Sequence, residues 1–187
     1  MTADFPVVLD ALRTRASLLA RHAPPLRREA NYLPRWSNEI LDELRRTLLE
    51  KLGRSSEQVD HLLNELNRHF ADARVEGFET LVALMTNDPG DRHVIAAAVK
   101  CGAEAIVTFN LRHFSDAALD TWNIEVQHPD GFLVHLYHLN PDLMVNILNE
   151  QAAFIGRTLA QLLAVLKQGV RNFAQLISDS LGVTETE

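Results

Sequence analysis

In the first two thirds of the chain, segments with a short continuous run of hydrophobic residues alternate with segments whose hydrophobic residues recur at helical spacing. Short runs rich in valine, isoleucine and phenylalanine predict buried strands at residues 5–9, 105–109 and 124–127. Apolar residues every three or four positions predict amphipathic helices over 37–53 and 56–70, and an alanine-rich helix is expected over 91–100. Strands that alternate with helices are typical of an α/β fold with a small parallel sheet.

Residues that begin and end helices support these boundaries. Ser37 is suited to cap the first helix, and Gly53 to end it. Asp91 follows the turn sequence Asn-Asp-Pro-Gly and begins the alanine-rich helix, which stops at Gly102. Residues 77–85 are compatible with either a strand or a loop.

The last third of the chain has only helical patterns. Helices are expected over 129–139, 141–155, 157–168 and 170–181. This part is too apolar for a linker, so it should pack on the core or on a partner. We therefore predict an α/β domain over residues 1–135 and a C-terminal helical extension over residues 136–187.

Composition and charge exclude several classes of protein. The 187 residues are 47% apolar and 23% charged, as in folded globular proteins, and the formal net charge is −7. Such an acidic chain does not bind nucleic acid through its overall charge, so a polyanion would need a local basic patch or metal ions. The sequence predicts neither a signal peptide nor a membrane span, and the single cysteine, Cys101, excludes an internal disulfide. We expect a cytoplasmic protein.

Four oxygen-bearing side chains fall where an α/β sheet binds its ligands. Asp10 ends the first strand, Glu39 lies in the first turn of a helix, Asp91 begins another helix, and Asn110 follows a strand. Singly, Glu39 and Asp91 are explained by helix capping and the helix dipole. Together, the four suit Mg²⁺ or Mn²⁺, which prefer oxygen ligands.

Four segments in the same order resemble the PIN-domain family. They are FPVVLDA, PRWSNEILDELRRTL, DPGDRHVIAAAVKCGAEAIVTFNLRHF and IEVQHPDGFL. More narrowly, the chain is similar to bacterial PIN proteins grouped with VapC-like toxins, over roughly residues 5–135. The resemblance implies a small parallel sheet flanked by helices, with acidic residues that coordinate Mg²⁺ or Mn²⁺ in a cleft.

The resemblance also implies roles for individual residues. Asp10, Glu39 and Asp91 match the three catalytic, metal-binding acids, and Asp88 is an auxiliary acid. Asn110 stands where the family often has aspartate, and it offers a carbonyl oxygen without a charge.

Two arginines, Arg92 and Arg112, flank the proposed acids and are candidates to bind the RNA phosphates, although surface ion pairs are a common alternative for such residues. The histidines have no zinc-ligand spacing, and Cys101 is expected to be an inert small hydrophobic residue.

The function implied by the resemblance is a metal-dependent endoribonuclease. Its partners would be an RNA substrate and a small antitoxin protein whose C-terminal segment enters the cleft, as in a toxin–antitoxin pair. The alternative is a catalytically weak PIN-like module for binding or oligomerisation. Asn110 favours this alternative, and so does the departure of residues 12–31 from the family pattern. Formation of a homo-oligomer through the helical extension is left open.

Residues 12–31 depart from the family pattern. They contain five of the fifteen arginines and one acid, Glu29, so their net charge is 5 − 1 = +4 and the rest of the chain carries −11. The pattern returns abruptly at Tyr32. A shifted reading frame across this stretch is one hypothesis. Divergence, or an arginine-rich loop that contacts RNA, is the other, and resequencing the gene separates them.

Overall fold

The computed structural model describes residues 5–10 and 32–182 and contains a four-stranded parallel sheet. The strand order is β2-β1-β3-β4, with both neighbours of β1 parallel to it. The strands are β1 (Phe5–Leu9), β2 (Tyr32–Arg35), β3 (Ala105–Val107) and β4 (Glu125–Gln127). The predicted α/β fold with a small parallel sheet is confirmed, and so are the three expected strands. The arginine-rich stretch 12–31, with the hypotheses attached to it, lies outside the described residues.

Strand β2 was not expected from the sequence. Its four residues, Tyr-Leu-Pro-Arg, have no apolar run, and Pro34 lacks the N–H that a central strand needs. The structure tolerates Pro34 because β2 lies at the edge of the sheet and pairs only with β1. Trp36 continues the chain beyond β2 and donates its backbone N–H to the Ala73 carbonyl at 3.0 Å.

Helices and turns connect β2 to β3. They are α3 (Asn38–Arg46), which continues into a π-helical turn (Thr47–Lys51), α4 (Ser56–His69), α5 (Glu79–Val82), a 3-10 turn (Pro89–Asp91) and α6 (Arg92–Cys101). The Ser37 hydroxyl caps α3 by accepting the backbone N–H of Ile40 at 3.3 Å, as the sequence predicted. Residues 77–85 contain the short helix α5 in place of the expected strand or loop, and Gly102 ends α6 with a φ of 64°.

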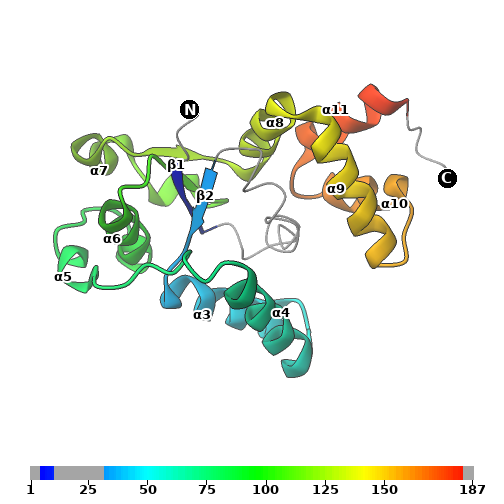
Figure 1. Ribbon diagram of the computed structural model, residues 1–187. Coiled ribbons are helices and arrows are strands. Elements are labelled where there is room, and N and C mark those ends of the chain that lie inside the picture. The colour runs from blue at the N-terminus through cyan, green and yellow to red at the C-terminus, as the bar shows by residue number, and fades with distance from the viewer. Residues whose placement is uncertain (1–4, 11–31, 183–187) are drawn as a thin grey trace.

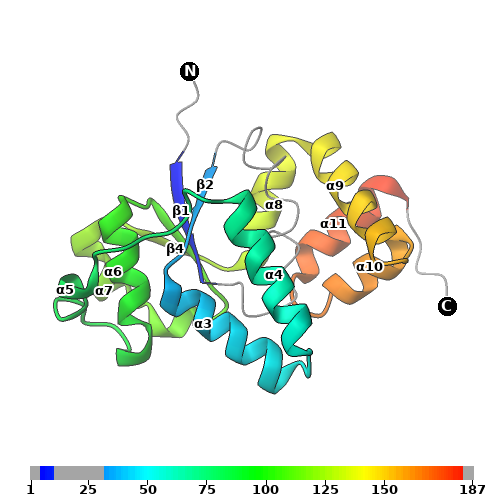
Figure 2. The same cartoon turned by 60° about the horizontal axis from the view of Figure 1, so that its bottom comes forward.

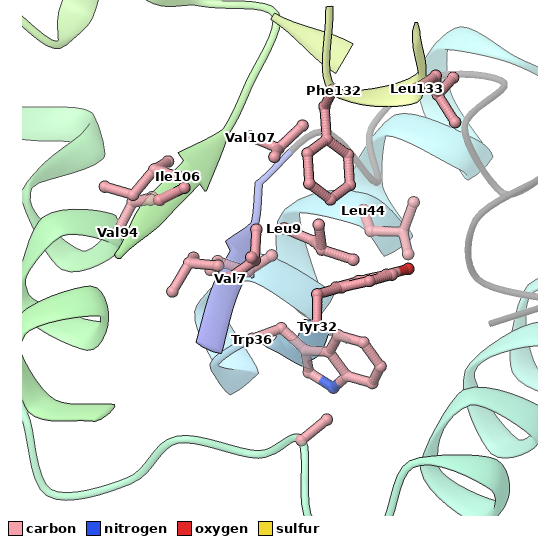
Figure 3. Close-up of a cluster of buried hydrophobic side chains, with 14 of the residues drawn as sticks. Val7, Leu9, Tyr32, Trp36, Leu44, Val94, Ile106, Val107, Phe132 and Leu133 are labelled. Carbon is pink, nitrogen blue, oxygen red and sulfur yellow. The ribbon is translucent and has the colours of Figure 1, made fainter. Parts of the chain in front are cut away.

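The core joins the sheet to helices from the middle and from the C-terminal part of the chain. The ring of Tyr32 meets Phe132 edge-on, with centroids 5.4 Å apart, and Trp36 meets Phe70 at 5.5 Å. Figure 3 shows Tyr32 between Phe132 and Trp36. On α6, the alanines at 96–98 are fully buried, and their small side chains let this helix pack closely on β1 and β3. Burial raises the pKa of the Tyr32 phenol.

The C-terminal part of the chain is helical from residue 129 onward. After the short α7 (Asp116–Leu119) come α8 (Pro129–Leu139), α9 (Pro141–Phe154), α10 (Leu159–Leu166) and α11 (Arg171–Leu181), close to the predicted bounds. Helix α11 packs on α8 and α10, and this group lies across the molecule from α5, α6 and α7 (Figures 1 and 2). The expected division between residues 135 and 136 falls within α8, and that boundary stays a prediction. No helix in the described ranges is long and apolar enough to cross a membrane.

One buried carboxylate ties α11 to α8. The side chain of Asp130, in the first turn of α8, accepts the backbone N–H groups of Asn172 at 3.0 Å and Phe173 at 2.8 Å. Val170, the residue before α11, provides no side-chain cap. Asp130 therefore caps a helix that lies about forty residues further along the chain.

Replacing Asp130 with Ala should lower the free energy of unfolding by about 1–3 kcal/mol, because the backbone N–H groups of Asn172 and the buried Phe173 lose a charged acceptor. Urea denaturation measures the effect. Asp42→Ala, which removes an exposed acid on α3, is the matched control and should change stability by less than about 0.5 kcal/mol. Equal effects of the two substitutions would contradict the assigned cap.

The thiol of Cys101 should react slowly with iodoacetamide in the folded protein. Burial raises the pKa of this thiol, so less thiolate is present at neutral pH. Mass spectrometry of the alkylated protein, compared with the protein unfolded in urea, measures the difference. Equal rates in the two states would contradict this account of Cys101 as an inert side chain.

Candidate metal centre

The candidate site lies at the carboxyl ends of β1 and β3. The chain leaves β1 toward β2 on one side, and the helices after β2 return it to β3 on the other side. Such a change of direction opens a crevice between two neighbouring strands, which is where open α/β sheets bind ligands. Asp10 directly follows β1, and Thr108 directly follows β3.

Asp10 is buried and held by a neighbouring strand. Only 2% of its surface is exposed, and Thr108 Oγ1 donates a hydrogen bond to its Oδ2 at 2.7 Å. The same hydroxyl accepts the backbone N–H of Asn110 at 3.0 Å. Thr108 therefore fixes both the first acid and the turn after β3. In the sequence, the feature that marks Thr108 is a hydroxyl side chain at the end of an otherwise apolar strand.

Three carboxylates from different elements meet here. Each of Asp10, Glu43 and Asp91 has a carboxylate oxygen within 4.8 Å of the others. Asp91, at the start of α6, is 4% exposed, and the Glu43 side chain, on α3, is 15% exposed. The structure thus brings together two of the three predicted acids, Asp10 and Asp91, and adds Glu43.

Glu39 lies outside this group of carboxylates. It is exposed in the first turn of α3, one helical turn before Glu43. The buried face of α3 consists of Ile40, Leu41 and Leu44, and helical geometry places Glu43 closer to that face than Glu39. We therefore propose Glu43, in place of Glu39, as the acid that α3 contributes.

A histidine outside the predicted set of site residues also contacts the site. His113 Nδ1 lies 2.5 Å from Asp91 Oδ2, and the His113 side chain is 26% exposed. Asp88, Asp91 and His113 form a second group whose ligand atoms lie within 4.8 Å of one another. Asp88 itself is exposed, and its Oδ1 accepts the backbone N–H of Gly90 at 3.0 Å. No spacing motif marks His113 in the sequence, because the fold brings it to Asp91.

Comparison with known proteins agrees with this architecture. A family model described as a PIN domain matches residues 4–112, which is more than half of the chain. The chain belongs to the PIN-domain family. A segment of 58 residues is 53% identical to "Putative ribonuclease VapC50" of Mycobacterium tuberculosis. That segment is 31% of this chain and 34% of the relative, so the match spans about a third of the relative's length. No solved structure matches the chain.

The remaining predicted residues of this PIN domain lie around the acids. Asn110 is half-buried and begins the 3-10 turn Leu111–His113. Arg92 is half-buried and donates Nε–H to the Asn87 carbonyl at 3.2 Å. Arg112 is exposed, and its Nε–H donates to His113 Nε2 at 3.2 Å. Both arginines therefore already use one donor within the protein.

The donor set of this PIN domain fits a hard divalent cation. Three carboxylates at this spacing repel one another, and the repulsion is strong because Asp10 and Asp91 are almost fully buried. A bound cation relieves that repulsion, and carboxylate oxygens are the ligands that Mg²⁺ and Mn²⁺ prefer. The imidazole of His93 also lies near the group, with its Nε2 4.0 Å from Glu43 Oε1.

Proposed function

We propose that this PIN domain is a metal-dependent endoribonuclease that hydrolyses RNA phosphodiesters. The observation that carries the proposal is the meeting of Asp10, Glu43 and Asp91 at the carboxyl ends of β1 and β3. A buried cluster of acids would oppose RNA by itself, because it adds negative charge where the phosphate must approach. With a cation held among them, the same acids favour a polyanion.

The proposed ligands of Mg²⁺ or Mn²⁺ are Asp10, Glu43 and Asp91, with Asn110 as a neutral oxygen ligand and Asp88 as an auxiliary acid at the edge. A divalent cation supplies positive charge that activates a water molecule as nucleophile and offsets the charge of the scissile phosphate. The protein's own contribution is to fix the acids in place.

Two different elements fix the buried acids. The Thr108 hydroxyl holds Asp10 at 2.7 Å, and the imidazole of His113 contacts Asp91 at 2.5 Å. Side chains held in this way lose little freedom on binding a cation, which favours a defined geometry at the reacting phosphate. Arg92 and Arg112 are proposed to bind RNA phosphates beside the acids through donors that the protein leaves available.

The proposed biological setting is that of a toxin neutralised by a small antitoxin protein in the cytoplasm. The family and the name of the mycobacterial relative support this proposal. The antitoxin would act by placing a segment over the same acidic cluster. A neighbouring gene that encodes a small protein able to co-purify with this chain would support the setting.

The experiment that tests the proposed function is cleavage of labelled single-stranded RNA by the purified protein. We expect cleavage in Mg²⁺ or Mn²⁺, loss of cleavage in a chelator, and recovery when the metal is restored. Asp10→Asn should be inactive under all three conditions. Cleavage that continues in the chelator, or that survives in Asp10→Asn, would contradict the proposal.

A further inference from the structure

His113 contacts the site without belonging to the set of proposed acids. It lies in the 3-10 turn Leu111–His113, and its backbone N–H donates to the Asn110 carbonyl at 2.9 Å. Phe114, the next residue, is 4% exposed and anchors the turn in the core. The turn therefore presents the His113 imidazole to Asp91 from a fixed backbone.

The two ring nitrogens of His113 have different partners, which determines where its proton lies. Arg112 Nε carries a hydrogen at all relevant pH values and can only donate, so His113 Nε2, 3.2 Å away, is the acceptor. The proton of the neutral ring is then on Nδ1. Nδ1 faces Asp91 Oδ2 at 2.5 Å and donates to it.

We propose that His113 is a positioning residue for Asp91, and that Arg112 selects the tautomer which lets it act in this way. This inference rests on the proposed function, in which Asp91 is a metal ligand. Hydrogen bonds to a carboxylate are among the stronger ones in proteins. By holding one oxygen of Asp91, His113 fixes the rotation of the carboxylate and therefore the position of the second oxygen.

The same geometry argues against His113 as a direct ligand. An imidazole nitrogen that carries a proton has no lone pair for a metal ion, and Nε2 is occupied by Arg112. Asp91 is the residue shared by the group with Asp10 and Glu43 and the group with Asp88 and His113. His113 therefore acts on the cation through Asp91. Partners of metal ligands typically change metal affinity by about 10- to 100-fold when removed.

The tautomer can be read directly from the metal-free protein. Long-range ¹H–¹⁵N correlation spectra at alkaline pH, where imidazoles are neutral, distinguish a protonated ring nitrogen from a bare one. We expect His113 to carry its proton on Nδ1, with Nε2 bare. A proton on Nε2, or equal amounts of both tautomers, would overturn the proposal without affecting the proposed metal site.

Metal affinity tests the consequence. Calorimetric titration with Mn²⁺ at one fixed pH compares the unsubstituted protein, His113→Leu, His113→Asn and the control His61→Leu, which changes an exposed histidine on α4. We expect His113→Leu to weaken binding by about 10- to 100-fold. His113→Asn, whose amide N–H can replace the Nδ1 donor, should stay within about threefold, and His61→Leu should have no effect.

The outcomes separate this inference from the proposed function. Unchanged affinity in His113→Leu, or an equal loss in His113→Leu and His113→Asn, would overturn the positioning role while leaving the metal site intact. Absence of Mn²⁺ binding in the unsubstituted protein would instead contradict the proposed function itself. Should His113→Leu fail to fold, the tautomer of His113 in the unsubstituted protein still decides the proposal.

Discussion

Asp91→Asn is expected to abolish metal-dependent RNA cleavage, with a rate at least about 10³-fold lower than that of the unsubstituted protein. Asp91 is buried, belongs to both groups of potential ligands, and contacts His113. Asparagine keeps the shape of the side chain and removes its charge, so the cluster holds a cation less strongly. A loss of about 4 kcal/mol of electrostatic stabilisation corresponds to about 10³ in rate.

The measurement is a time course of labelled single-stranded RNA in Mn²⁺ or Mg²⁺. Asp116→Asn, which changes an exposed acid in α7, is the matched control and should cleave at the unsubstituted rate. Thermal unfolding should show that Asp91→Asn remains folded, because the substitution conserves volume. Cleavage by folded Asp91→Asn at a rate near that of the control would refute the assignment.

Glu43→Gln and Glu39→Gln should have very different effects, although the two residues are one turn apart on α3. Glu43 has a carboxylate oxygen within 4.8 Å of those of Asp10 and Asp91, whereas Glu39 is exposed outside this group. Loss of a metal ligand should reduce metal affinity by more than the ~10- to 100-fold that is typical when a hydrogen-bonding partner of a ligand is removed. We therefore expect Glu43→Gln to reduce cleavage by at least about 100-fold and Glu39→Gln by less than about twofold.

Each variant serves as the control for the other, because both replace a glutamate of the same helix with glutamine. The comparison uses initial cleavage rates at several Mn²⁺ concentrations. A weaker metal site should make Glu43→Gln require more Mn²⁺ for half-maximal rate, and Glu39→Gln should follow the unsubstituted curve. A large loss of cleavage confined to Glu39→Gln would contradict the assignment of Glu43 and support Glu39 as the metal-binding acid.

Periodicity and capping residues predicted most of the architecture. The apolar run at β1, the alanine-rich α6 and the four C-terminal helices carry strong local signals, and all are found close to the expected bounds. Strand β2 was missed because its stability comes from pairing with β1, which the four residues of β2 do not encode by themselves. An edge position tolerates Pro34, and a sequence pattern does not reveal which strands lie at the edge.

The candidate site was predicted less completely than the fold. Asp10 and Asp91 follow strong local signals, a strand end and a turn before a helix, and the structure brings them together. Glu39 is predicted from its place in the first turn of a helix and from the family resemblance, whereas the acid that reaches the site depends on which way α3 faces after packing. Thr108 and His113 contact the acids through tertiary structure, so spacing in the sequence does not identify them.

Calorimetric titration of the full chain with Mn²⁺ tests the central claim most directly, because it asks whether the acidic cluster holds a cation independently of any RNA. We predict saturable binding to the unsubstituted protein, and loss of that binding in Asp10→Asn, which replaces a residue that is 2% exposed. Absence of binding heat at millimolar Mn²⁺ in the folded, unsubstituted protein would contradict the account and favour the catalytically weak binding module.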